Sequence, residues 1–124
     1  PVNFAFDDAT IRPEDQAALD RFAQIVGKYY GGSMVTVEGF ADPAGSATYN
    51  MGLSRRRAES VRDYLTSKGL TADQLRAIGM GEQRLVVPGA ERDEPGAEQN
   101  RRVVFVVETK GQAAEVTAAA TSAG

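Results

Sequence analysis

The apolar run from Val103 to Val107 limits the fold of this chain more than any other segment. Four of its five residues are β-branched valines, so its length and composition favour a strand that is buried on both faces. A strand buried on both faces belongs in the interior of a sheet. We therefore expect a sheet in which this run occupies a central position.

The segments before this run alternate between strand-like and helix-like patterns. Three earlier strands are predicted, at Val2–Phe6, Met34–Phe40 and Leu75–Gly79. Apolar residues at steps of three and four predict two helices, one from Pro13 to Gly31-Gly32 and one from about Tyr49 to Lys68. In a chain of 124 residues, the order β-α-β-α-β-loop-β predicts one α/β domain with helices packed against a single sheet.

Two segments have the composition of loops or tails. Residues 80–100 are rich in glycine, proline and acidic side chains, which predicts a long surface loop with room for one helical turn. Residues 111–124 are rich in alanine, threonine and serine and lack periodic large apolar residues, so we expect a disordered or loosely helical tail. The predicted domain therefore covers residues 1–110, followed by a flexible tail at 111–124.

Composition narrows the chemistry available to the chain. It has no cysteine and no histidine, which removes thiolate nucleophiles, the commonest nitrogen metal ligand and the usual neutral-pH general base. The net charge of −3 gives no electrostatic case for nucleic acid, and no apolar run is long enough to span a membrane. Two adjacent acids, Asp7 and Asp8, are weak grounds for a cation site, so we expect neither a metal nor a cofactor. A start at Pro1 suggests an excised piece or a mature domain.

One arginine of the second helix lies on its apolar stripe. At roughly 100° per residue, Arg57 falls between Leu53 and Val61 on the core-facing arc, whereas Arg55 and Arg56 fall outside it. An arginine at such a position is costly unless a carboxylate or a ligand pairs with it. Two structural explanations remain open: its stem lies on the apolar face while its head reaches water, or it forms an internal salt bridge.

Asp42 is the acid most suited to act with this arginine. The sequence Asp42-Pro43-Ala44-Gly45 matches a type I turn, in which an aspartate at the first position also caps the backbone. Asp42 follows the second predicted strand and Arg57 lies about two turns into the next helix, so both side chains can reach the same end of the sheet. An exposed acid opposite a partly sequestered arginine suits an ammonium and a carboxylate on one ligand.

Several motifs, in order along the chain, resemble the OmpA-like domain family. They are FAFDDATIRP, VEGFADPAGSATYNMGLSRRRAESVRDYLTSKGL, GMGEQ and NRRVVFVV, and together they cover roughly Val2 to Val107. The family occurs at the C-terminus of OmpA-type porins, in peptidoglycan-associated lipoprotein and in flagellar stator proteins. The resemblance implies an α/β fold (an α+β sandwich) with one mixed sheet packed against helices. It also implies non-covalent binding of peptidoglycan through the diaminopimelate of the stem peptide.

The same resemblance assigns residues to the binding site. Asp42 would contact the ammonium group of the ligand and Arg57 its carboxylate. The other residues expected around the pocket are Asn50, Leu53, Phe6, Asp7 and Ala41, the last mainly through its backbone.

The chain departs mildly from the family pattern at Phe40, where His or Tyr is usual, and at Ala41, where Thr is usual. Asn100-Arg101-Arg102 matches the family's NRR, for which a structural role is at least as well supported as ligand contact. The family implies a periplasmic location, in an outer-membrane-associated or otherwise envelope-anchored protein, with peptidoglycan and other envelope proteins as partners.

Two other function classes are compatible with the sequence. Asp7, Asp8, Glu38 and Asp42 supply enough carboxylates for glycan hydrolysis, but without an activated nucleophile pattern we expect no enzyme. The alternative is a protein-interaction or dimerisation module without peptidoglycan affinity, for which the acidic loop at residues 89–98 offers a surface and a weak homodimer is one form.

Overall fold

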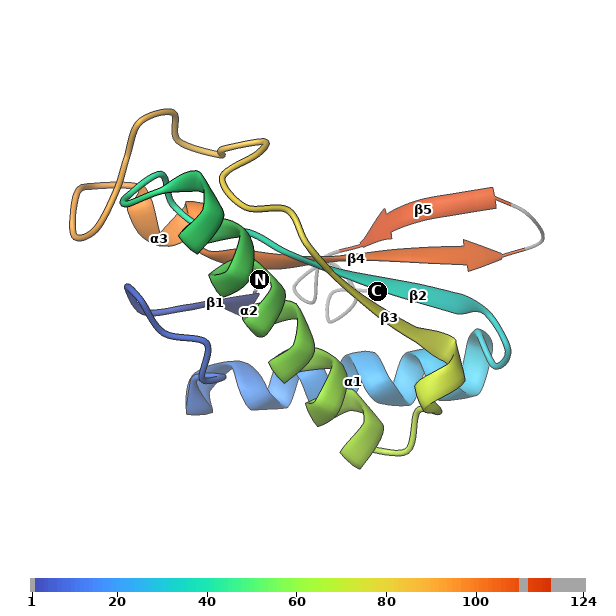
Figure 1. The fold of residues 1–124 in the computed structure, drawn as a ribbon. Helices are drawn as coiled ribbons and strands as arrows, with labels where there is room; N and C mark the ends of the chain where they lie inside the picture. The colour runs from blue at the N-terminus through green and yellow to red at the C-terminus, as the bar shows by residue number, and fades with distance from the viewer. Residues whose placement is uncertain (1, 110–111, 117–124) are drawn as a thin grey trace.

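A computed structural model describes residues 2–109 and 112–116 of the chain. The elements follow the order β1 (Val2–Asn3), α1 (Pro13–Tyr29), β2 (Met34–Gly39), α2 (Ala47–Ser67), the 3₁₀ turn η1 (Ala72–Gln74), β3 (Leu75–Gly79), α3 (Ala97–Asn100), β4 (Arg102–Thr109) and β5 (Gln112–Val116). Figure 1 shows α1 and α2 beside one mixed sheet. The predicted α/β class and strand–helix order are confirmed. Within these residues, no helix is both long and apolar enough to cross a membrane.

The sheet is mixed and β4 lies at its centre, as the apolar run predicts. Its strand order is β1-β4-β2-β3, with β5 also paired to β4. The pair β2–β3 is parallel, whereas β2, β1 and β5 all run antiparallel to β4. Along β4, Val103, Phe105 and Val107 join the core under the helices, and Val104 on the other face is only 6% exposed.

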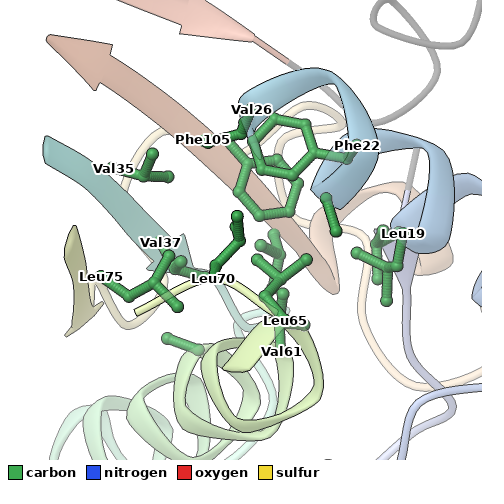
Figure 2. Packing of buried hydrophobic residues seen from close by; sticks show 14 of the residues in the cluster. Leu19, Phe22, Val26, Val35, Val37, Val61, Leu65, Leu70, Leu75 and Phe105 are labelled. Carbon is green, nitrogen blue, oxygen red and sulfur yellow. The ribbon is translucent and has the colours of Figure 1, made fainter. Parts of the chain in front are cut away.

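The core lies between the sheet and the two long helices. The apolar stripe of α1 contributes Leu19, Phe22 and Val26, and Phe22 stacks on Phe105 of β4 with ring centroids 4.1 Å apart (Figure 2). Burying one such ring contributes about 1.5–3 kcal/mol relative to an exposed ring. The helix stripes predicted from the sequence therefore face the sheet.

Two glycines at the ends of neighbouring strands bring α2 into backbone contact with the sheet. A Cβ atom added at Gly39 would lie 2.0 Å from the carbonyl oxygen of Ser54, and one added at Gly79 would lie 2.7 Å from the amide nitrogen of Arg55. Only glycine fits such a close approach. The approach places the middle of α2, including Arg57, over the end of β2.

Strand β1 is shorter than predicted, because the carbonyl groups that follow it are hydrogen-bonded to two arginine side chains. The expected strand Val2–Phe6 is paired only at Val2 and Asn3. The carbonyl oxygen of Phe4 accepts from Arg101 Nε at 2.7 Å, and that of Ala5 accepts from Arg57 Nη2 at 3.1 Å. The chain after Asn3 therefore bonds to arginine side chains and no longer to a strand, which its alternating sequence pattern does not indicate.

The prediction of an unstructured tail is wrong for part of that segment. Gln112–Val116 forms β5, paired with β4 from Phe105 to Thr109. Since β2 occupies one edge of β4 and β1 covers only two residues of the other, the remaining edge carries unpaired backbone groups that accept a further strand. Residues 111 and 117–124 of the expected tail lie outside the described residues. The loop predicted at 80–100 is observed, with α3 as its helical turn.

Candidate binding site

Arg57 of α2 is completely buried and is held by backbone carbonyl groups from two other segments. Its side chain has no exposed surface. Its Nε donates to the carbonyl oxygen of Asp8 at 2.8 Å, its Nη1 to that of Phe40 at 3.1 Å, and its Nη2 to that of Ala5 at 3.1 Å. A guanidinium group has five N–H bonds, so each terminal nitrogen retains one N–H beyond these contacts.

The charge of Arg57 has no partner in direct contact among residues 2–109 and 112–116. No carboxylate of those residues lies within ion-pair distance, 4.0 Å, of its guanidinium group. Burial and, second to it, the positive charge of Arg101 together lower the pKa of Arg57 to about 10. The group still carries its proton at neutral pH. The sequence left two structural explanations open, a guanidinium group that reaches water and an internal salt bridge. Neither describes Arg57 in the structure.

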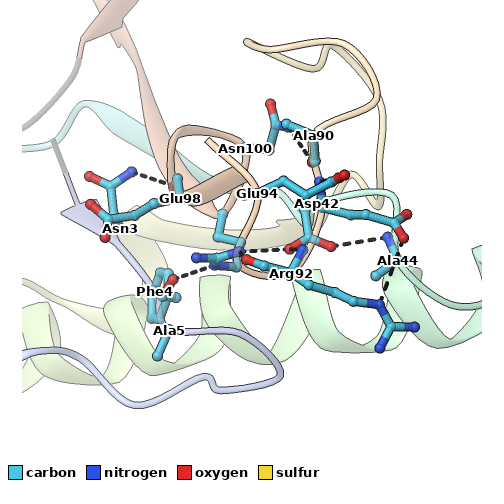
Figure 3. A network of polar contacts seen from close by, with 12 residues as sticks. Asn3, Phe4, Ala5, Asp42, Ala44, Ala90, Arg92, Glu94, Glu98 and Asn100 are labelled. Atoms are coloured by element: carbon cyan, nitrogen blue, oxygen red, sulfur yellow. Dashed lines mark hydrogen bonds and ion pairs between the residues drawn. The ribbon is translucent and has the colours of Figure 1, made fainter. Parts of the chain in front are cut away.

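Asp42 follows β2 and is buried, with its carboxylate already engaged. Its Oδ1 accepts from the amide of Ala44 at 3.0 Å, and its Oδ2 accepts from the amide of Arg92 at 3.2 Å and from Arg101 Nη1 at 2.8 Å. The expectation of an exposed acid is wrong, because only 4% of Asp42 is exposed. Figure 3 shows the contacts that meet at this carboxylate. Its turn-capping role, the donation from Ala44, is present as well.

Arg101 connects Asp42 to both the N-terminal segment and the long loop. Its side chain is 7% exposed and donates to the carbonyl oxygens of Phe4 and Arg92, each at 2.7 Å, besides its ion pair with Asp42. The structural role expected for the NRR motif is therefore observed. Taken together, Arg57, Arg101 and Asp42 place two positive charges and one negative charge in the interior. This buried cluster has a net charge of +1.

A cavity of about 160 Å³ opens beside this cluster. All the site residues predicted from the sequence line it, although they come from three separate segments: Phe6, Asp7, Ala41, Asp42, Asn50, Leu53 and Arg57. The cavity wall also includes Ala44, Gly45, Tyr49 and Arg92. The fold therefore brings the predicted residues together, while their contact with a ligand stays a prediction.

Three of the predicted residues in the cavity wall are uncharged. Asn50 is 2% exposed and donates from Nδ2 to the carboxylate of Glu82 at 3.0 Å. Leu53 is 6% exposed and provides an apolar surface, and the amide of Ala41 donates to the carbonyl oxygen of Gly81 at 2.8 Å. Gly81 and Glu82 of the GMGEQ segment thus hold two residues of the cavity wall through hydrogen bonds.

The rim of the cavity is aromatic and charged. Phe6 and Tyr49 are about half exposed, at 45% and 47%. The hydroxyl of Tyr49 donates to Oδ1 of Asp7, and this hydrogen bond raises the pKa of Tyr49. Asp7 has a φ of 55°, in the left-handed region that few side chains adopt. These contacts join the end of the N-terminal segment to the first turns of α2.

Sequence reasoning missed Tyr49 and Arg92. Tyr49 lies one turn before Leu53 on α2, so its position beside the pocket follows from helical spacing. Arg92 lies 50 residues after Asp42 in the loop before α3, where no periodic pattern indicates a spatial neighbour. Among the described residues, no group of three or more acidic side chains is placed to hold a metal ion.

Comparisons with known proteins show similarity to outer membrane protein A and to peptidoglycan-associated lipoproteins. A family model described as "OmpA family" matches residues 3–101. The chain is 50% identical over 86 residues to outer membrane protein A of Escherichia fergusonii, covering 68% of this chain and 35% of that protein. It is 41% identical over 109 residues to peptidoglycan-associated lipoprotein of Rhizobium meliloti, covering 86% of this chain and 58% of that protein. The chain thus spans about a third to somewhat more than half of these relatives.

Solved structures agree with the fold. The peptidoglycan-associated lipoprotein of Burkholderia pseudomallei superposes with a TM-score of 0.79 at 31% identity, covering 86% of this chain and 88% of that one. The OmpA-like domain of FopA1 from Francisella tularensis superposes with a TM-score of 0.73 at 26% identity, covering 94% of this chain and 73% of that one.

Proposed function

The chain belongs to the OmpA family, and from this membership we propose that it binds peptidoglycan non-covalently, through the diaminopimelate of the stem peptide. Its relatives include a peptidoglycan-associated lipoprotein. The proposed role is to anchor an envelope protein to the cell wall from the periplasm, by binding without catalysis.

The observation that carries this proposal is that Arg57, at the wall of the cavity, has no carboxylate in direct contact among the described residues. The buried cluster has one positive charge in excess, and both terminal nitrogens of Arg57 keep an N–H beyond their carbonyl partners. An uncompensated buried charge is costly, and a ligand carboxylate would compensate it with charge-assisted hydrogen bonds. Because Arg57 exposes no surface, this contact requires the cavity wall to yield, and Phe6 and Tyr49 on the rim are each about half exposed.

Asp42 would accept the ammonium group of the same ligand. A carboxylate offers about four acceptor positions, and three donors already occupy those of Asp42. Its Oδ1 accepts only from Ala44 and therefore has room for one more donor. The exposed carboxylate of Asp7 at the rim provides a second acceptor. One small cavity thus has a donor for a ligand carboxylate and acceptors for a ligand ammonium group. These match the zwitterionic end of diaminopimelate.

The size of the cavity supports a small end group over a large ligand. Sites for drug-sized molecules occupy about 300–1,000 Å³, whereas this cavity measures about 160 Å³. It would seat the amino-acid end of the diaminopimelate side chain and leave the rest of the peptide outside.

Sedimentation with purified sacculi tests the proposal. We expect the protein to sediment with sacculi and free meso-diaminopimelate to compete it off. Nα-acetyl-lysine, whose free ammonium group has no carboxylate on the same carbon, should compete poorly. Arg57→Lys should abolish the diaminopimelate-sensitive fraction, and the exposed substitution Arg55→Lys should not. A parent protein that stays in the supernatant, or whose sedimentation diaminopimelate leaves unchanged, would overturn the proposal. A tight dimer without affinity for sacculi would instead favour the interaction module.

A further inference from the structure

We infer that Arg92 contacts a second carboxylate of the bound peptide, outside the cavity, and so makes binding sensitive to the residue next to the diaminopimelate. This inference rests on the proposed function. It adds a selective contact from the long loop before α3, a segment that contributes no residue to the predicted site.

The backbone of Arg92 is fixed on the buried ion pair of the site. Its amide donates to Oδ2 of Asp42 at 3.2 Å, and its carbonyl oxygen accepts from Nη1 of Arg101 at 2.7 Å. Both partners of the ion pair therefore bind the main chain of one loop residue. Arg92 has a φ of 57°, a conformation that an ordinary residue adopts only when its surroundings enforce it. Although it belongs to a loop, Arg92 has a defined position at the mouth of the cavity.

The side chain of Arg92 is accessible and only weakly paired. It is 60% exposed, and its Nε lies 3.7 Å from a carboxylate oxygen of Glu91. An exposed pair at that separation contributes little, because water screens it. The guanidinium carbon lies 5.5 Å from the centroid of the Phe6 ring, the other exposed side of the rim. Glu94, which belongs to the same acidic loop, directs Oε1 to the amide of Glu91 at 2.9 Å.

The part of a bound peptide that does not fit in the cavity must extend outward past these rim residues. The cavity holds only the zwitterionic end of the diaminopimelate, so the peptide backbone of the ligand would cross the rim between Phe6, Tyr49 and Arg92. In the stem peptide, the residue before the diaminopimelate is a γ-linked glutamate with a free α-carboxylate. Arginine binds such a planar carboxylate through two parallel hydrogen bonds. An accessible arginine at the rim is thus suited to that group.

Calorimetric titration with two tripeptides tests the inference. The ligands are L-Ala-γ-D-Glu-diaminopimelate and the same peptide with the α-carboxylate of its glutamate converted to an amide. We expect the amide to bind the parent protein about twofold to fivefold more weakly, as for an exposed ion pair. Arg92→Gln should show a similar loss for the free acid and no further loss for the amide. Arg55→Gln, an exposed charge change on α2 away from the cavity, should behave as the parent.

The outcomes separate this inference from the proposed function. Equal affinity of the parent for both tripeptides, with free diaminopimelate still bound, would overturn the role of Arg92 and leave the site intact. An Arg92→Gln variant that loses affinity equally for both peptides would also overturn it, since the loss would then come from the loop and not from the carboxylate. If the parent binds neither tripeptide nor diaminopimelate, both proposals fail together.

Discussion

Asp42 and Arg101 form a buried ion pair, with 2.8 Å between Oδ2 and Nη1, and Arg57 lies beside it without joining it. The pair links residues 59 positions apart in the sequence. It also holds the N-terminal segment through Phe4 and the long loop through Arg92. The acid proposed to bind the ligand is thus part of the internal framework of the domain.

Removing Asp42 should therefore destabilise the fold as well as abolish binding. In Asp42→Ala, Arg101 remains buried without its counter-ion, and breaking a buried pair in this way costs about 3–5 kcal/mol. Urea denaturation followed by circular dichroism measures the free energy of unfolding. The double variant Asp42→Leu/Arg101→Met should recover part of that loss, because it leaves no unpaired charge. A single variant as stable as the parent would show that the ion pair does not hold these segments together.

Replacing Arg57 by lysine should weaken both the fold and the ligand contact. An ammonium group cannot bond three separated carbonyl groups and a carboxylate with the fixed geometry of a guanidinium group. We expect Arg57→Lys to lose about 1–3 kcal/mol of unfolding free energy. Diaminopimelate should raise the melting temperature of the parent but not of the variant. Equal ligand-induced shifts in both proteins would contradict a direct contact with Arg57.

Gly39 should not tolerate a side chain. In Gly39→Ala the new Cβ atom would lie 2.0 Å from the carbonyl oxygen of Ser54, so α2 would have to move away from β2. We expect a loss of several kcal/mol in unfolding free energy, or no folded protein. Gly27→Ala on α1 is the matched control, because its nearest contact, Leu70, would be 4.0 Å away. That control should be neutral or more stable by up to about 1 kcal/mol, since alanine favours a helix. Similar effects at the two glycines would contradict the close approach.

Tyr64 should give the domain a pH dependence in the alkaline range. Its hydroxyl donates to Asp20 at 2.6 Å, and this hydrogen bond raises the pKa of Tyr64 from 10.0 to about 12. The protonated phenol is the form stabilised by folding, so its contribution is complete below pH 10 and disappears as the pH rises to about 12. The difference in unfolding free energy between the parent and Tyr64→Phe should shrink over that range. Ultraviolet titration should show a late-titrating phenol in the parent that is absent from the variant.

The sequence predicts the elements whose pattern is local. The valine run indicates a central strand, and the three- and four-residue spacing on α1 and α2 indicates which side of each helix faces the core. The same spacing identifies Arg57 as an unusual residue on an apolar stripe. Family motifs then predict residues that all line one cavity.

The features that the sequence does not predict depend on distant partners. The sequence around Asp42 does not indicate that this residue is buried, because its partners Arg101 and Arg92 lie 59 and 50 positions later in the chain. Strand β1 ends at Asn3, and the next two carbonyl groups accept from Arg101, just before β4, and from Arg57 of α2. Strand β5 depends on the unpaired edge of β4, which its own alanine-rich sequence does not reveal.

The segment from Phe4 to Asp8 joins the sheet to the cavity through carbonyl groups bonded to Arg101 and Arg57. A pull on Val2, in the strand before this segment, would therefore be transmitted to the two guanidinium groups beside the pocket. In the proposed role as a tether, tension along the chain and retention of the ligand would then depend on the same few bonds. Tension would then change the shape of the surface that we propose to bind the cell wall.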